Sequence, residues 1–226
     1  MSDEEKFSSK IQSILRPART IPRTKWTAAS RWELNFSRFL ILLSGLFLFG
    51  FGEALLFKAN LGNSPWAVFA QGISKRSGIS VGIATFFISG VVLLLWLPFN
   101  QYPGLGTICN MIFVAMSLQI GIDHFPTLSG LGEKIPAILL GIAMVGLGSG
   151  FYITCGLGAG PRDGLMTAIH KKTQIRVGRV RLFLELLVFL IGWLLGGVVG
   201  IGTALFALLI GNSVAFGFKI VSKYSI

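Results

Sequence analysis

Two short segments of the chain share the pattern Leu-Gly-x-x-Pro. The first reads Leu61-Gly62-Asn63-Ser64-Pro65, and the second, 96 residues later, reads Leu157-Gly158-Ala159-Gly160-Pro161. Glycine and proline together interrupt a helix, because glycine leaves the backbone unrestricted and proline has no amide hydrogen to donate. Each segment follows a long apolar stretch. The pattern therefore predicts a break between helices at two matching places in the chain.

The match between the two halves extends well beyond these breaks. At the same shift, Val81-Gly82 falls on Val177-Gly178, and Gly104-x-Gly106-Thr107 falls on Gly200-x-Gly202-Thr203. An ungapped alignment of this length is typical of an internal repeat. We divide the chain into a basic arm (1–37), a first membrane repeat (38–122), a second membrane repeat (134–218) and a short tail (219–226).

The composition favours a membrane location for both repeats. Of the 226 residues, 53% are hydrophobic and 13% are charged, whereas a soluble domain carries about 25% charged residues. A helix needs about 20 apolar residues to cross a bilayer. Six stretches approach that length, at 39–58, 81–99, 104–122, 135–154, 179–196 and 199–218. Two shorter pieces, 65–76 and 161–172, each begin with a proline and are expected to be interrupted or interfacial helices.

Each repeat holds three of the six spans, and an odd number places the second repeat upside down relative to the first. The expected fold is an all-α polytopic membrane protein made of two inverted three-helix repeats. Transporters of this type bind their substrate between the repeats, where broken helices direct their positive N-termini at the ligand. We therefore predict a small-solute transporter or channel-like permease with its site between the two LGxxP segments.

The basic residues indicate an orientation in the membrane. With the N-terminus in the cytoplasm, sixteen of the 20 Lys and Arg residues fall on the cytoplasmic side, and only Lys58, Lys75, Arg76 and Lys134 fall outside. Such an excess predicts that both termini are cytoplasmic. We expect the arm to contact anionic lipid headgroups rather than nucleic acid. Trp96 and Trp193, near the ends of spans, are predicted to anchor the chain at the membrane interface.

Ionisable side chains within the spans are candidates for function, because a charge in lipid is costly. Glu53 could bind a cation, carry a proton, or simply pair with Lys58 or a helix N-terminus. Arg181 and Glu185 have the i, i+4 spacing of an ion pair. Asp163 suits the helix dipole, and its neighbour Arg162 could hold an anion there. The full set predicted to line the solute or ion path is Glu53, Asn60, Gly62, Pro65, Asn110, Gly158, Pro161, Arg162, Asp163, Arg181 and Glu185.

Signatures of catalysis and metal binding are absent from the sequence. It contains no GxSxG, Walker or HExxH motif, and its two cysteines, Cys109 and Cys155, show no metal-binding spacing. We expect no enzyme activity, no metal and no cofactor, while a homo-oligomer is compatible with the sequence. The alternative to a transporter is a non-transporting membrane scaffold or accessory protein for envelope or biosynthetic partners.

Several of these segments are together similar to the YczE-like bacterial membrane proteins, which are related to the YitT group. They are the LGNSPW segment at 61–66, the run at 158–166, the Val180-Arg181…Glu185 pair and the glycine-rich run at 192–203. The resemblance covers roughly residues 33–218 and implies a multi-pass protein of the bacterial inner membrane. This chain departs from the family at Ala67, where many members carry an acidic residue.

Overall fold

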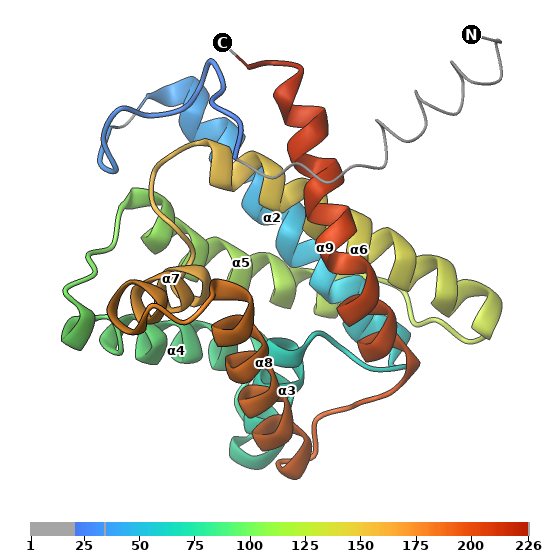
Figure 1. Cartoon of the computed structure of the whole chain (residues 1–226). Helices are drawn as coiled ribbons and strands as arrows, with labels where there is room; N and C mark the ends of the chain where they lie inside the picture. The colour runs from blue at the N-terminus through green and yellow to red at the C-terminus, as the bar shows by residue number, and fades with distance from the viewer. Residues whose placement is uncertain (1–20, 34, 226) are drawn as a thin grey trace, which may run out of the picture.

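The computed structural model describes residues 21–33 and 35–225, so the arm up to residue 20 lies outside the described residues. An isolated bridge joins Thr24 to Ser225, which places this part of the arm beside the C-terminal end. The elements are α2 (Phe36–Ala59), α3 (Pro65–Ser77), α4 (Val81–Leu94), the 3-10 turn η1 (Leu97–Phe99), α5 (Leu105–His124), α6 (Leu131–Thr154), α7 (Pro161–Thr173), α8 (Val177–Leu194) and α9 (Ile201–Ser222) (Figure 1). The expected all-helical fold is confirmed.

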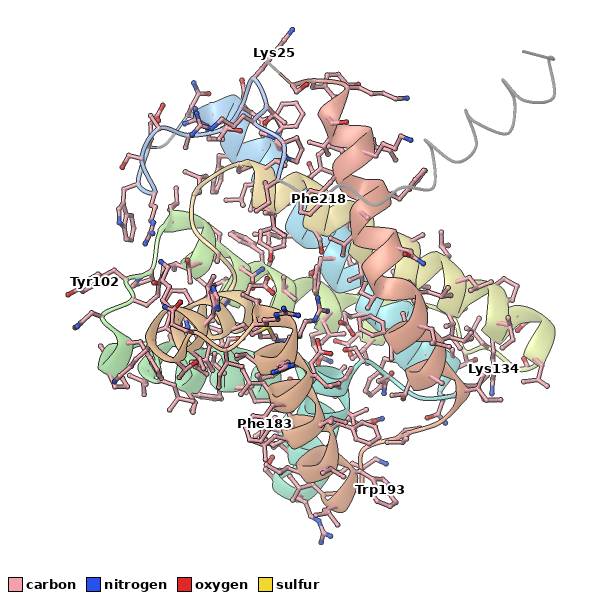
Figure 2. All side chains as sticks on the ribbon, viewed as in Figure 1. Lys25, Tyr102, Lys134, Phe183, Trp193 and Phe218 are labelled. Atoms are coloured by element: carbon pink, nitrogen blue, oxygen red, sulfur yellow. The ribbon has the colours of Figure 1, made fainter. Side chains whose placement is uncertain are left out.

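Five of the described helical segments are long and apolar enough to cross a membrane. They are α2, α4 together with η1, α5, α6 and α9. α8 covers the predicted fifth span but carries three charges, Arg179, Arg181 and Glu185. Apart from the exposed Arg179 near its start, its outer surface is apolar: Phe183 and Trp193 lie at its periphery and are 66% and 56% exposed (Figure 2). Exposed apolar surface of this kind suits lipid better than water.

Both LGxxP segments end one helix and begin the next. At the first, Ser64 caps α3 by accepting a hydrogen bond from the Ala67 N–H, and Pro65 is the first helical residue. The described residues with positive φ form four pairs separated by 96 positions: Asn60 and Gly156, Gly62 and Gly158, Gly78 and Gln174, Asn100 and Gly196. The backbone therefore turns in the same way at matched positions of the two halves.

α2 and α6 cross at the centre of the fold through pairs of glycines (Figure 1). A β-carbon on Gly45 would lie 2.9 Å from the Gly148 carbonyl oxygen, and one on Gly52 would lie 2.6 Å from that of Gly141. Because these pairs run in opposite order along the chain, the two helices are antiparallel. Small residues that let backbones approach closely are typical of helix contacts in membranes. α5 packs on α2, and α9 packs on α6.

Each half also forms a backbone hydrogen bond to the LGxxP segment of the other half. The Gly106 N–H at the start of α5 donates to the Leu157 carbonyl at 2.8 Å. In the same way, the Gly202 N–H at the start of α9 donates to the Leu61 carbonyl at 2.8 Å. These two bonds are equivalent, because Gly202 lies 96 residues after Gly106 and Leu61 lies 96 residues before Leu157. The two halves are thus joined by exchanged, matching contacts.

The halves differ in how their second and third long helices pack. In the first half, the Gly82 N–H donates to the Gln119 side-chain oxygen at 2.9 Å, and a β-carbon on Gly82 would lie 2.7 Å from the Ala115 carbonyl. In the second half, β-carbons on the equivalents Gly178 and Gly211 would meet nothing within 4 Å. α8 lies along α3 rather than along α9 (Figure 1). The second half therefore has a gap between α8 and α9 at the position where α4 and α5 of the first half are in contact.

The described part of the arm, residues 21–33, packs on the helix ends. Trp26 donates its indole N–H to the Thr154 hydroxyl at 3.1 Å, at the end of α6. Glu33 pairs with Arg38 at 3.0 Å, which ties the arm to the first turn of α2. Residues 21–33 therefore pack against the end of α6 and the start of α2.

Trp96 is buried, so the prediction that it anchors the chain at the membrane interface is wrong. Its side chain is 2% exposed and donates its N–H to the Pro161 carbonyl at 3.0 Å. The ring covers Gly164, where a β-carbon would lie 2.0 Å from a ring carbon. Because Gly164 on α7 has no side chain, the Trp96 ring can pack inside the protein instead of at the membrane interface.

Candidate functional site

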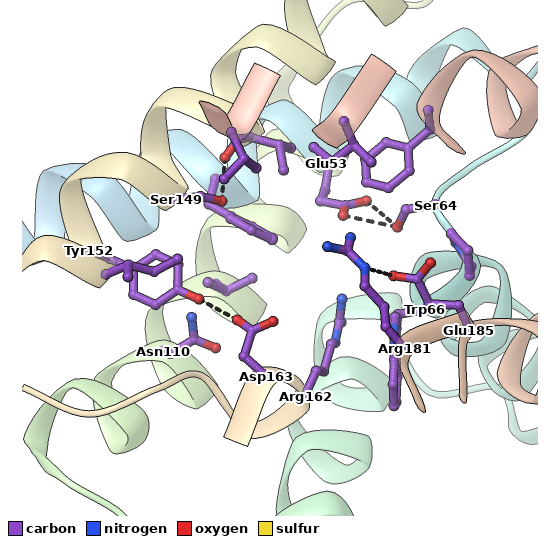
Figure 3. A pocket seen from close by; sticks show the side chains of 18 of the residues that line it. Glu53, Ser64, Trp66, Asn110, Ser149, Tyr152, Arg162, Asp163, Arg181 and Glu185 are labelled. Atoms are coloured by element: carbon purple, nitrogen blue, oxygen red, sulfur yellow. Dashed lines mark hydrogen bonds and ion pairs between the residues drawn. The ribbon is translucent and has the colours of Figure 1, made fainter. Parts of the chain in front are cut away.

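A cavity of about 170 Å³ lies between the two helix breaks, and every α-helix described contributes a side chain to it. Its charged side chains come from α2, α7 and α8; they are Glu53, Arg162, Asp163, Arg181 and Glu185 (Figure 3). α9 contributes only apolar side chains, Phe206, Ile210, Val214 and Phe218. The cavity therefore has a charged wall and an apolar wall.

Glu53 is the most deeply buried charged side chain of this wall, at 3% exposure. The Ser64 hydroxyl reaches both of its carboxylate oxygens, at 2.9 and 2.8 Å. Since Ser64 is the N-cap of α3, the carboxylate lies at the positive end of that helix, where negative charge is favoured. No ion pair to Lys58 forms within the described part of the chain. Of the structural partners expected for Glu53, the helix N-terminus is the one present.

Asp163 enters the cavity from the first turn of α7. The Tyr152 hydroxyl on α6 donates to its Oδ2 at 2.7 Å, while Oδ1 has no donor among the residues described. Asn110 lies close by, with its amide group 3.3 Å from where a β-carbon of Gly160 would stand (Figure 3). The glycine before the proline therefore leaves room for a polar side chain of α5 at the start of α7.

Arg162 lies over the Trp66 ring, with its Cζ atom 4.9 Å from the ring centroid. This cation–π contact fixes the side chain in the cavity. Glu53 and Glu185 are near enough to interact electrostatically with it. Within residues 21–33 and 35–225, however, its guanidinium makes no hydrogen bond and no ion pair shorter than 4.0 Å. Its N–H groups are therefore free to bind a ligand.

Arg181 and Glu185 form the expected i, i+4 ion pair, with Nε and Oε1 2.8 Å apart. Only the Nε–H of Arg181 is used in this bond. The rest of the guanidinium extends over the cavity opposite Glu53 (Figure 3). The pair balances two charges and still presents donors to the cavity.

The structure brings seven of the predicted site residues together at the cavity: Glu53, Pro65, Asn110, Arg162, Asp163, Arg181 and Glu185. The other four lie outside it. Asn60 is exposed at the end of α2. Gly62 and Gly158 face Thr203 and Thr107 at the starts of α9 and α5, and the carbonyl of Pro161 accepts from Trp96. Gly62, Gly158 and Pro161 shape the helix breaks, because their backbones contact the opposite half of the protein. Asn60 ends α2, where its N–H donates to the Phe57 carbonyl at 3.1 Å.

Five cavity residues with a polar side-chain atom were not predicted as site residues from the sequence: Ser64, Trp66, Ser89, Ser149 and Tyr152. Ser64 carries a usable signal, since a serine directly before a proline is a common start of a helix. Ser149 and Tyr152 lie three residues apart on α6 and so share one face. For Trp66 and Ser89 the sequence offers no comparable signal.

A family model described as a family of unknown function, DUF6198, matches residues 36–219. The uncharacterised membrane protein YczE of Bacillus subtilis is 34% identical over 187 residues, which cover 82% of this chain and 84% of the relative. This chain belongs to the YczE-like DUF6198 family. An uncharacterised protein of Haemophilus influenzae is 41% identical over 208 residues, which cover 92% of this chain and 95% of that protein. YyaS of B. subtilis is 25% identical over 168 residues, which cover 71% and 82%.

No solved structure matches the chain. The resemblance to YczE-like proteins is confirmed, and the description of YczE as a membrane protein agrees with the five apolar helices. The YczE-like region, residues 36–219, contains both helix breaks and every residue that lines the cavity. The described arm, residues 21–33, lies before it. The cavity is therefore a feature of the region shared with the family.

Proposed function

We propose that this protein transports a small solute across the membrane and binds it in the cavity between the two helix breaks. The observation that carries this proposal is the group of charged side chains gathered in that cavity, with Glu53 buried in the C-terminal third of the apolar helix α2. Ionisable groups at such positions are costly, and they mark substrate and ion paths in membrane proteins. The free guanidinium of Arg162 supports a binding role rather than a purely structural one.

We also propose that the fold is a six-span inverted repeat. The antiparallel crossing of α2 and α6 supports it, because both helices are long enough to span and they occupy equivalent positions in the two halves. α8 is proposed as the sixth span. Two of its three charges, Arg181 and Glu185, face the cavity and pair with each other. The third, Arg179, is exposed near the start of the helix, and the rest of the outer surface is apolar.

The difference between the two halves supports alternating access as the mechanism. Transporters with inverted repeats expose their site to one side and then to the other as the repeats move against each other. Here α4 is closed on α5 at Gly82, whereas α8 stands away from α9 at Gly178. The opposite state would have α8 closed on α9 and α4 released from α5.

The two ends of the chain are proposed to lie in the cytoplasm of a bacterial cell, with the protein in the inner membrane. The bridge between Thr24 and Ser225 supports a common side for both ends. The basic residues near these ends, including Lys25, Arg38 and Lys223, support the cytoplasmic side because such residues are enriched there.

Purified protein in liposomes is expected to show solute-dependent flux when a broad panel of small solutes is tested. We expect Glu53→Gln to lower the rate about tenfold or more, because it removes the charge that Ser64 and the start of α3 hold in the cavity. Glu133→Gln is the matched control, since Glu133 is an exposed carboxylate in the first turn of α6. Uptake of labelled solute and electrical recording on supported membranes both measure the rate.

Folded protein that moves none of the panel would contradict the transport proposal. The scaffold alternative makes a different prediction: a stoichiometric partner that is lost when residues 1–20 are deleted. Equal loss of flux in Glu53→Gln and Glu133→Gln would contradict the specific role of Glu53.

A further inference from the structure

The cavity holds hydrogen-bond donors that no described residue satisfies. The Arg162 guanidinium has no acceptor, and Arg181 uses only one of its N–H groups. A guanidinium without an acceptor favours a ligand that supplies one. A planar carboxylate suits a guanidinium especially well, because it accepts two parallel hydrogen bonds.

Acceptors are free in the same cavity. Asp163 receives the Tyr152 hydroxyl on one oxygen, which leaves its other oxygen available. Glu185 is paired through Oε1, and its Oε2 has no hydrogen bond among the residues described. The Asn110 amide stands beside the start of α7, close to Asp163 (Figure 3). Oxygen atoms of this kind suit an ammonium group, which carries three donors and no acceptor.

The balance of charge argues against a ligand of a single sign. Arg181 and Glu185 neutralise each other, which leaves the cation of Arg162 beside the carboxylates of Glu53 and Asp163. A simple anion would bind to Arg162 but would also face two carboxylates. A simple cation would bind to a carboxylate but would leave the free guanidinium without an acceptor. A ligand that carries both charges satisfies both.

The rest of the ligand is defined by the apolar wall. α9 presents Phe206, Ile210, Val214 and Phe218 to the cavity, and no polar side chain. The volume of about 170 Å³ is small; for comparison, a cavity of about 150 Å³ holds a benzene molecule. A compact apolar group fits this space, whereas a sugar phosphate or a peptide would not.

We infer that the cavity binds a small zwitterion, an α-amino acid with an apolar side chain. Its carboxylate binds to the N–H groups of Arg162, its ammonium group lies toward Asp163, and its side chain packs on α9. The inference rests on the proposed function, because it names the substrate class of the same site. Ligand binding is measured on the purified protein in detergent, so a failure of this inference can be told apart from a failure of transport.

Three small molecules with the same branched apolar group test this inference. Leucine carries both charges, 4-methylpentanoate lacks the ammonium group, and 3-methylbutylamine lacks the carboxylate. Calorimetry and thermal melting of the purified protein in detergent measure their binding. We expect leucine to bind and to raise the melting temperature, and each of the other two to bind about tenfold more weakly or worse, since each loses one charged contact.

The contrary outcomes are distinct from one another and from a failure of transport. Equal binding of leucine and 4-methylpentanoate would overturn the inference in favour of an anion site. Equal binding of leucine and 3-methylbutylamine would do so in favour of a cation site. No binding of leucine, valine or phenylalanine at millimolar concentration would also overturn it. Flux of some other solute would then leave the proposed function standing.

Two variants connect the binding to individual residues. Arg162→Gln is expected to weaken leucine binding about tenfold or more and to remove the advantage of leucine over 3-methylbutylamine. Asp163→Asn is expected to remove its advantage over 4-methylpentanoate. Arg179→Gln is the control, because Arg179 is exposed and does not line the cavity. If Arg162→Gln does not fold, Arg162→Lys keeps the charge but loses the planar pair of donors, and weaker binding is again expected. Wild-type affinity for leucine in a folded Arg162 variant would overturn the inference.

Discussion

Replacing Gly178 by leucine is expected to abolish transport while the protein stays folded and still binds its solute. A β-carbon at Gly178 meets nothing within 4 Å, so the new side chain fits the state described here. Its equivalent in the first half, Gly82, is in close contact with α5: a β-carbon there would lie 2.6 Å from the Gln119 β-carbon. If the second half must adopt the arrangement of the first, α8 has to approach α9 at Gly178. A leucine would hold the two helices apart.

The measurement compares three quantities for one variant: flux in liposomes, the melting temperature, and solute binding in detergent. We expect flux to fall to background, about a hundredfold or more, while the melting temperature and the affinity keep their wild-type values. Gly90→Leu is the control, because a β-carbon there also meets nothing within 4 Å and its equivalent, Leu186, is exposed. Wild-type flux in Gly178→Leu would contradict closure of α8 on α9.

The repeat could be predicted from the sequence because its backbone turns depend on particular residues. Positions such as Gly62 and Gly158 have φ values of 111° and 115°, which residues with side chains rarely adopt. The glycines therefore appear in the sequence at both places. The difference between the halves could not be predicted, since Gly82 and Gly178 both follow a valine at the start of a helix but have different surroundings.

The candidate site could be predicted only in part, for a reason particular to membranes. The ionisable residues Glu53, Arg181 and Glu185 stand out, because charges are rare in apolar helices. A helix that is apolar on all sides does not reveal which face lies inside. The sequence therefore could not show that Tyr152 faces Asp163. Nor could it show that Trp96 is buried, because the space for its ring is made by a glycine on another helix.

The partner of Glu53 illustrates the same limit. Lys58 lies five residues away in the sequence and is a plausible ion-pair partner, whereas Ser64 lies eleven residues away beyond the break. The turn at the break folds α3 back so that its N-cap meets the carboxylate. That return depends on Gly62 and on its contacts with the start of α9, which belong to tertiary structure.

Replacing Gly148 by leucine is expected to have the largest effect on stability. A β-carbon there would lie 2.5 Å from the Gly45 carbonyl oxygen and 2.7 Å from the Phe49 amide nitrogen, both of them backbone atoms of α2. Overpacking of an adaptable core costs about 1–3 kcal/mol, and a backbone cannot rotate aside as a side chain does. We expect the melting temperature in detergent to fall by about 10 °C or more, with less monodisperse protein recovered.

Two further variants make the test specific to the contact between α2 and α6. Gly132→Leu changes the same helix where a β-carbon would meet nothing within 4 Å, so the melting temperature should stay near the wild-type value. Gly52 is the equivalent of Gly148 in the first half, and a β-carbon there would lie 2.6 Å from the Gly141 carbonyl. If the two halves cross as a matched pair, Gly52→Leu should destabilise the protein about as much as Gly148→Leu. A wild-type melting temperature in Gly148→Leu would mean that α2 and α6 do not meet at these glycines, and the antiparallel crossing on which the inverted repeat depends would be lost with it.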